Sequence, residues 1–442
     1  MASLSDLLPA SARRDGAGRL VIGGCSVVDL SEEYGTPLYL YDQATLDTAL
    51  AEYRTALTTY WPGTAEIAYA AKAWLSLAMA QWAARRELGL DVVSHGEMEI
   101  ARRAGFPPER MHAHGNNKPA LFLDQAIAAG VGRIVVDGEA DLEATIEAAR
   151  RQGRRQAIWL RLNLGVAAGT HRHVETGGAT TKFGLSFADG SAHRAARRAL
   201  GSPDVELLGL HMHIGSQIAD PAPLVAAIER VLDFAAVLTS EQDWQWRELS
   251  PGGGWAVPYV PGGPRLAPEH ALAALSRTIA DRCRQTGLRL PHLVLEPGRE
   301  LVARAGVALY RVGMVKRAGT VNYAFVDGGL GDNPRPTLYE ARYTAVLANR
   351  EAPPSSIYTL AGPYCESGDV LIRELYLPEL YPGDLLAVPV SGAYQLSMAS
   401  TYNGIPRPAV LWLNESGSWF VQRRESIDDL LARDRPLDPS IL

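Results

Sequence analysis

The sequence predicts an α/β protein with two domains: an N-terminal (β/α)8 barrel of the TIM type and a C-terminal all-β domain. Three observations lead to this prediction. The chain has 442 residues, which is too many for one average core. Its middle alternates short apolar runs with longer amphipathic ones, as parallel βα units do. After about residue 305 helical periodicity is weak, and short apolar segments are separated by Gly, Pro, Asn and Asp.

The predicted barrel strands are near-continuous apolar runs, and most are followed by a helix-like stretch such as EADLEATIEAARRQG. Eight such units favour a closed barrel, although an open, doubly wound sheet remains the alternative from pattern alone. The strand candidates are EIAYAAKA (66–73), GLDVVS (89–94), RMHAH (110–114), RIVVDG (133–138), IWLRLNLG (158–165), ELLGLHMHIG (206–215), WRELSPGGG (246–254) and HLVLEPG (292–298).

These elements place the barrel at residues 36–304 and the β domain at residues 305–442. Residues 1–35 carry one short strand candidate, GRLVIGG, and are expected to pack on the β domain.

The composition argues against several classes of protein. Apolar residues make up 47% and charged residues 21%, the net charge is −6, and no basic block stands out, which disfavours nucleic acid and anionic membranes as partners. Three distant cysteines without a CxxC disfavour a disulfide framework and a structural zinc site. The sequence has no signal-peptide pattern and no apolar run of about 18 residues, so a cytoplasmic enzyme is expected.

Lys72 is an unusual residue because it lies within the apolar stretch YAAKAWLS, where an ammonium ion is costly unless it is paired or neutral. Only four of the 43 basic residues are lysine, so arginine serves wherever charge alone is needed. Arginine cannot replace an amine that must lose its proton or form a covalent bond. Lys72 is therefore a candidate for covalent chemistry.

Polar residues occur at the predicted C-terminal strand ends, where barrels collect their chemistry. Singly each would read as a cap or turn residue, but together they predict a polar, convergent mouth. Besides Lys72 they are Asp91, Ser94, Asn116, Asp137, Arg161, His213, Ser216, Gly252, Gly253, Gly254, Glu296 and Arg299.

Three of these motifs have a specific chemical logic. The glycines of SPGGGW let backbone N–H groups approach a phosphate, or they form a tight turn. In LEPGRE, Glu296 could pair with a ring nitrogen, or form an ion pair with Arg299. In HMHIGSQ, His211 and His213 lie two apart on one strand face. They could bind a metal, but no third ligand is evident, so no metal is expected; stacking on a planar cofactor is equally consistent.

The β domain adds GPYCESGD, which places Cys365 and Glu366 near a loop tip. An inert cysteine is the alternative interpretation of Cys365. An amine, a phosphate loop, a carboxylate and a flat side chain are the parts needed to hold pyridoxal 5′-phosphate, in which the ring accepts an electron pair while a carboxylate keeps its nitrogen protonated.

Ten motifs in order resemble the diaminopimelate decarboxylase family of fold type III pyridoxal phosphate enzymes. They are YAAKAW, LDVVSHGE, HGNNKP, TKFGL, GLHMHIGSQI, PGGG, EPGRELV, RPTLY, GPYCESGD and GAYQLSMASTYN, and the resemblance covers residues 35–404. It implies a barrel followed by a β domain, and a head-to-tail homodimer with shared active sites. The activity it implies is decarboxylation of meso-2,6-diaminopimelate to L-lysine, the last step of lysine biosynthesis.

The resemblance also implies roles for individual residues. Lys72 is the Schiff-base lysine, His213 stacks on the ring and Glu296 pairs with the ring nitrogen. Cys365, from the partner chain, matches the proton donor. The cofactor neighbourhood is completed by Asp91, Ser216, Gly252, Gly253, Gly254, Gly298, Arg299 and Tyr394. The substrate is held by Arg299, Arg335, Tyr339, Glu366 and Tyr394.

Four positions depart from the family pattern near the predicted mouth: Trp74, His95, Pro119 and Thr401. In addition, Ser250 and Pro251 replace an Asp-containing approach to the glycines. None of these changes removes a cofactor ligand, but they bear on substrate identity. The alternatives are therefore a decarboxylase of lysine, ornithine, arginine or a carrier-linked amino acid, an amino-acid racemase, and a non-catalytic cofactor carrier. Glu296 argues against a racemase, which usually leaves the ring nitrogen unprotonated.

Overall fold

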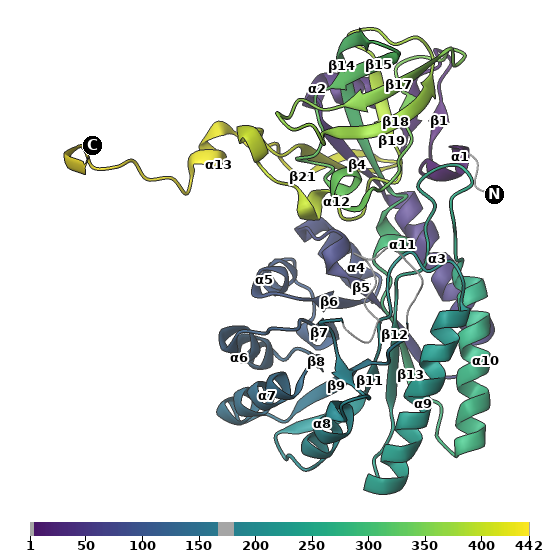
Figure 1. Ribbon diagram of the computed structural model, residues 1–442, viewed down its shortest axis with the longest axis vertical. Helices are drawn as coiled ribbons and strands as arrows, with labels where there is room; N and C mark the ends of the chain where they lie inside the picture. The colour runs from purple at the N-terminus through teal and green to yellow at the C-terminus, as the bar shows by residue number, and fades with distance from the viewer. Residues whose placement is uncertain (1–3, 167–180, 442) are drawn as a thin grey trace. The chain divides into compact units, whose positions relative to one another are not determined.

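The computed structural model describes residues 4–166 and 181–441 (Figure 1). The chain divides into two compact units. The first, here the barrel unit, comprises Thr48–Pro258 and Pro264–Leu301. The second, here the β unit, comprises Met1–Asp47, Tyr259–Gly263 and Val302–Leu442. Among the described residues, no helix has the length and apolar character needed to span a bilayer.

The barrel unit is a closed ring of eight parallel strands. Their order around the ring is β9-β11-β12-β13-β5-β6-β7-β8, and pairing of β8 with β9 closes it. This closure confirms the predicted TIM-type barrel and excludes the open sheet. The strands are β5 (Ala65–Ala70), β6 (Gly89–Val92), β7 (Met111–Ala113), β8 (Arg133–Val136), β9 (Gln156–Asn163), β11 (Val205–His211), β12 (Glu248–Gly252) and β13 (His292–Leu295). The two-residue β10 (Leu185–Ser186) adds to β9.

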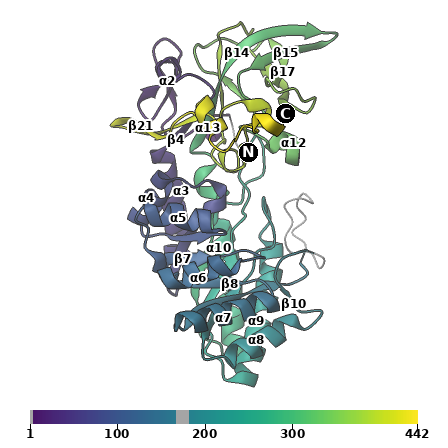
Figure 2. The same ribbon diagram turned by 90° about the vertical axis from the view of Figure 1, so that its left-hand side faces the viewer.

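Helices follow the strands and surround them, as Figures 1 and 2 show. Local sequence sets several of their ends: Ser76 and Ser94 cap the first turns of α4 and α5, and the left-handed Gly130 and Gly153 end α6 and α7. The helices are α4 (Leu77–Arg85), α5 (His95–Arg103), α6 (Ala120–Ala129), α7 (Glu139–Gln152), α8 (Ser191–Leu200), α9 (Ala222–Gln242) and α10 (Pro268–Thr286). Outside this series, α3 (Gln43–Tyr60) precedes β5 and α11 (Arg299–Val302) follows β13.

The β unit contains a nine-stranded sheet and a three-stranded one. The larger has the path β18-β17-β15-β14-β4-β20-β21, with β19 and β16 branching from β14. Its strands are β4 (Leu38–Asp42), β14 (Gly306–Ala318), β15 (Val321–Val326), β16 (Val346–Leu347), β17 (Ser356–Ala361), β18 (Val370–Leu377), β19 (Leu385–Val388), β20 (Ala409–Asn414) and β21 (Gly417–Gln422). The smaller sheet has β1 (Arg13–Arg14), β2 (Leu20–Ile22) and β3 (Cys25–Ser26). The short helices are α1 (Leu4–Leu7), α2 (Val27–Tyr34), α12 (Arg335–Tyr339) and α13 (Ile427–Leu431).

The division between the units differs from the predicted bounds at β4. This strand lies within the range 36–304 assigned to the barrel, yet it pairs with β14 and β20 of the β unit. Leu38 and Leu40 share a core there with Leu20 and Ile22 of the N-terminal segment. The run LYLYD is buried throughout, as a barrel strand would be, so its sequence does not reveal which sheet it joins.

Candidate active site

Lys72 lies in the 3-10 turn Ala71–Ala73 directly after β5, and not within a strand as the range 66–73 implied. The turn is held by Tyr69, whose hydroxyl donates to the carbonyl of Trp74 at 2.6 Å and accepts from its amide at 3.1 Å. Ala71, Ala73 and Trp74 are buried, but the Lys72 side chain is exposed. The apolar residues around Lys72 therefore anchor its backbone and do not enclose its ammonium group.

His213 lies beyond the end of β11, close to Lys72 and to the glycine segment. A Cβ atom at Gly252 would come within 2.7 Å of the His213 ring nitrogen Nδ1, and one at Gly254 within 3.1 Å of Cε1. Burial, followed by the charges of Lys72 and Arg161, holds the pKa of His213 well below its ordinary value. The ring is therefore a neutral, flat surface beside the lysine.

The glycine segment 252–254 has no space for side chains. A Cβ at Gly253 would lie 2.2 Å from the Glu296 carbonyl oxygen, and one at Gly254 would lie 2.1 Å from the Gly215 carbonyl oxygen. Gly252 and Gly254 also have φ values of +73° and +91°, which other residues rarely adopt. Gly298 lies against Ala70 and Ala73, on either side of Lys72. These glycines allow four strand ends to approach one another closely.

Glu300 is a half-buried residue that the sequence analysis missed. Its Oε1 accepts from the amides of Gly254 (2.8 Å) and Trp255 (2.5 Å), and its Oε2 from the amide of Gly298 (3.1 Å). The amides of Gly254 and Gly298 thus bind an internal carboxylate. The approach of the glycine amides to a phosphate stays a prediction. The signal for Glu300 was present as the acidic residue in EPGRE.

Glu296 follows β13 and is held from two neighbouring strands. Its Oε2 lies 3.0 Å from His211 Nε2, and its Oε1 accepts from the Ser250 hydroxyl at 2.6 Å. Burial alone would raise the pKa of Glu296, but its electrostatic interactions with His211 and His114 and the hydrogen bonds from His211 and Ser250 hold it well below its usual range. Glu296 is therefore an anion, and Ser250, a departure from the family pattern, helps to orient it.

Arg299 and Ser216 form a hydrogen-bonded pair in the barrel unit. The Arg299 guanidinium donates to the Ser216 hydroxyl at 3.1 Å, although only 5% of the arginine is exposed. A buried guanidinium beside a hydroxyl provides several donors for one anion. Farther around the ring, Arg161 forms an ion pair with Asp137 at 3.6 Å and lies over the Phe183 ring.

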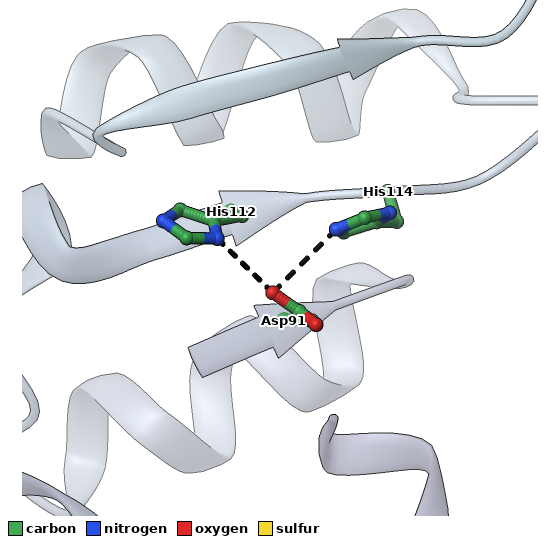
Figure 3. A group of neighbouring side chains, drawn as sticks. All are labelled: Asp91, His112 and His114. Carbon is green, nitrogen blue, oxygen red and sulfur yellow. Dashed lines mark hydrogen bonds and ion pairs between the residues drawn. The ribbon is translucent and has the colours of Figure 1, made fainter. Parts of the chain in front are cut away.

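Asp91 lies inside the barrel within β6, in contact with two histidines that the sequence analysis did not single out (Figure 3). Its Oδ1 is 3.1 Å from His112 Nδ1 and 3.5 Å from His114 Nε2. His112 Nε2 lies 3.2 Å from Glu66 Oε1. The alternation in RMHAH, which puts both histidines on one strand face, was the available signal.

The ring nitrogens and carboxylates of this group are close enough to share a metal ion in two combinations, one with Asp91 and one with Glu296. We assign no metal here, because His112 already contacts a carboxylate through each ring nitrogen and Arg133 lies 3.2 Å from its Nε2. In the second combination, both Glu296 oxygens already have partners in His211 and Ser250. The Arg133 guanidinium opposes a second cation, so the group is best described as a chain of ion pairs.

In the β unit, Arg335 at the start of α12 is buried between two tyrosines. Its guanidinium lies over the rings of Tyr259 and Tyr343, with centroid distances of 4.6 and 5.7 Å, and it donates to the Tyr343 hydroxyl. Gln395, next to Tyr394, contacts the same hydroxyl at 2.6 Å. Residues of RPTLY and GAYQ, two distant motifs, therefore meet here.

The loop with Cys365 and Glu366 is exposed and fixed at its base. The Cys365 amide donates to Asn403 Oδ1 at 2.9 Å, and Thr337 of α12 donates to the Gly368 carbonyl at 2.9 Å. Asp369 accepts from the amides of Leu330 and Tyr364, both at 2.8 Å. The motifs carrying Arg335, Tyr339, Cys365 and Glu366 are thus neighbours within the β unit.

Tyr394 has a φ of +67°, a left-handed conformation that is uncommon for a bulky residue. Such strain concentrates at functional sites, because the surrounding structure must hold it in place. The role of Tyr394 in binding stays a prediction.

The barrel residues fit the parts of pyridoxal phosphate. Arg299 and Ser216 offer donors to a phosphate, the closely packed glycines leave no Cβ in its way, and Glu296 offers an anion to a ring nitrogen. Lys72 offers an exposed amine after β5.

Comparison with known proteins gives the family. Residues 44–303 match the family described as pyridoxal-dependent decarboxylase, pyridoxal binding domain. The chain is 39% identical to the diaminopimelate decarboxylase of Bacillus subtilis, covering 98% of this chain and 99% of that protein. It is 38% identical to that of Halalkalibacterium halodurans, covering 97% and 98%. The chain belongs to the diaminopimelate decarboxylase family.

Structural similarity agrees with this membership. The diaminopimelate decarboxylase of M. jannaschii in complex with L-lysine has a TM-score of 0.92 at 31% identity, covering 98% of this chain and 99% of that one. The chain is accordingly a pyridoxal phosphate-dependent carboxy-lyase.

The four departures from the family pattern occupy different environments. Trp74 is only 2% exposed and directly follows the Lys72 turn, whereas His95, Pro119 and Thr401 are exposed at the starts of α5, α6 and the turn 402–404. Of these four, only Trp74 is therefore an interior residue.

Proposed function

We propose that this chain decarboxylates meso-2,6-diaminopimelate to L-lysine and CO2, the last step of lysine biosynthesis. The observation that carries the proposal is the anionic Glu296 carboxylate, held by His211 and Ser250 in the barrel unit that also carries Lys72 and the Arg299–Ser216 pair. Full-length relatives with this activity in their names support the choice of substrate.

The barrel residues would act together on the cofactor. When bound, pyridoxal phosphate accepts the electron pair left by the departing CO2. Glu296 holds a proton on the ring nitrogen, and the neutral His213 ring offers a stacking face. Ser216 and Arg299 bind the phosphate, with Gly252, Gly253, Gly254 and Gly298 allowing close approach, and Asp91 acts through its histidine contacts. Lys72 supplies the covalent amine.

Residues of the β unit would select the substrate. Arg335, supported by its two tyrosines, and Tyr339 bind the distal carboxylate, and Arg299 assists. The Glu366 carboxylate binds the distal amine, and Tyr394 contacts the phosphate and the substrate. Cys365 donates the proton that replaces CO2.

We also propose a head-to-tail homodimer in which Cys365 and Glu366 complete the partner's site. The exposure of their loop on the single chain, together with its fixed base, suits a segment that enters another subunit. A cytoplasmic location remains a prediction from the sequence.

A substrate panel tests the proposed function. Protein loaded with cofactor is assayed for CO2 release from meso-diaminopimelate, L-lysine, L-ornithine and L-arginine. We expect release from meso-diaminopimelate with L-lysine as product. Release from L-lysine alone would assign the chain to the alternative decarboxylases, and inverted substrate without CO2 would make it a racemase.

A further inference from the structure

A line of five titratable side chains runs through the interior of the barrel and ends at Glu296. The successive separations are 3.2 Å from Glu66 to His112, 3.1 Å from His112 to Asp91, 3.5 Å from Asp91 to His114 Nε2, and 4.0 Å from His114 Nε2 to Glu296 Oε1. The side chains come from four different strands or their ends, so only the closed barrel brings them together.

His114 makes the two longest contacts in this line, at 3.5 and 4.0 Å. It is 7% exposed, and its backbone is fixed by a bond from its amide to the Val92 carbonyl at 2.8 Å. Among the described residues, its Nε2 has no hydrogen-bond partner, yet it faces two carboxylates at ion-pair distance (Figure 3 shows the Asp91 side). A buried nitrogen between two anions is favourable when it carries a proton and a positive charge.

We propose that His114 is a positioning residue for the cofactor: as an imidazolium between Asp91 and Glu296 it keeps the Glu296 carboxylate anionic. Two carboxylates around one point disfavour ionisation of each other, and a cation between them removes that penalty. The inference rests on the proposed role of Glu296 toward the ring nitrogen.

Within residues 4–166 and 181–441, the other titratable groups that face His114 are Glu97 and the His211 ring, which lies 5.1 Å away edge-on. Glu296 is faced by His211, Ser250, Arg161 and His213. Burial alone would raise the pKa of Glu296, whereas its interactions with His211 and His114 lower it. This direction agrees with the proposal.

The test is the pH dependence of cofactor affinity, which needs no turnover. The dissociation constant of pyridoxal phosphate is measured by fluorescence titration from acidic to weakly alkaline pH for the wild type, His114→Gln and the exposed surface control His270→Gln. Glutamine retains a neutral N–H donor but removes the charge. We expect the acidic loss of affinity in His114→Gln to begin about one pH unit higher, so that binding is about tenfold weaker within that range. The control should follow the wild type.

A merely structural role would weaken binding equally at every pH, and such parallel profiles would overturn the proposal. If His114→Gln does not fold by circular dichroism, His114→Asn replaces it with the same expectation. Glu296→Gln separates the two hypotheses. If it retains the wild-type acidic limb, the proposed role of Glu296 is wrong. If it abolishes that limb while the His114 variant matches the wild type, only the inference about His114 is wrong.

Discussion

At the scale of single residues, Glu300 shows how one half-buried acid can support two glycine motifs. Its carboxylate collects three backbone amides from the two glycine motifs. Glu300→Gln presents an NH2 group to donors, so we expect a loss of about 2–4 kcal/mol in the free energy of unfolding. Urea denaturation of the cofactor-free protein measures it, with the exposed Glu241→Gln as control. Equal stabilities would mean that the amides do not need the carboxylate.

His112 supports a second prediction at this scale, concerning pH. Burial alone would lower its pKa, but hydrogen bonds to Asp91 and Glu66 raise it from 6.5 to about 9. A raised histidine pKa stabilises the fold fully below 6.5, and this contribution disappears as the pH rises through 9. We expect stability to fall across this window by at most about 3 kcal/mol.

Subtracting the unfolding free energies of His112→Gln from those of the wild type at each pH isolates this contribution. The difference should shrink as the pH increases from 6.5 to 9. A difference that stays constant across the window would contradict the assignment of a charged His112.

At the scale of elements, Lys118 joins the loop after β7 to β8 and α7. Its ammonium donates to the carbonyls of Gly115 and Val135, each at 2.7 Å, and to Asp141 Oδ2 at 2.6 Å. Lys118→Met leaves the Asp141 carboxylate, whose side chain is 10% exposed, without its cation, so we expect a loss of about 3–5 kcal/mol in unfolding free energy. Lys316→Met, on an exposed stretch of β14, should change it by less than about 0.5 kcal/mol. Thermal or urea unfolding compares the two variants. Similar losses of unfolding free energy in both would contradict the role of Lys118 in connecting the loop to β8 and α7.

Lys118 also qualifies the argument from lysine scarcity. A compact ammonium with three donors suits its three acceptors, a geometry that the planar guanidinium of arginine does not reproduce. The scarcity of lysine therefore indicates two different kinds of residue: Lys72, whose amine is exposed, and Lys118, which is buried and connects three segments. Only the tertiary structure around each lysine distinguishes the two.

At the scale of the whole molecule, the proposed dimer predicts complementation between two inactive variants. Lys72→Ala and Cys365→Ala proteins are unfolded and refolded together. If each site takes Lys72 from one chain and Cys365 from the other, half of the dimers are mixed and have one intact site. We then expect about a quarter of the wild-type activity. Activity no higher than that of the separate variants would show that both residues serve one chain.

The sequence alone was enough to predict alternating strands and helices, because short apolar runs separated by amphipathic stretches can be recognised without any knowledge of contacts. It favoured a closed barrel over an open sheet, and the pairing of β8 with β9 decided between them. The sequence was also enough for the family, because ten motifs occur in order. Contacts between residues that are distant in the sequence could be seen only in the tertiary structure. There the strand LYLYD pairs within the β unit, and the Gly254 amide donates to Glu300. Asp91, His114 and Glu296, from separate strands, lie close together. Periodicity records which face of an element is buried, whereas contacts between residues far apart in the chain depend on how the ring closes.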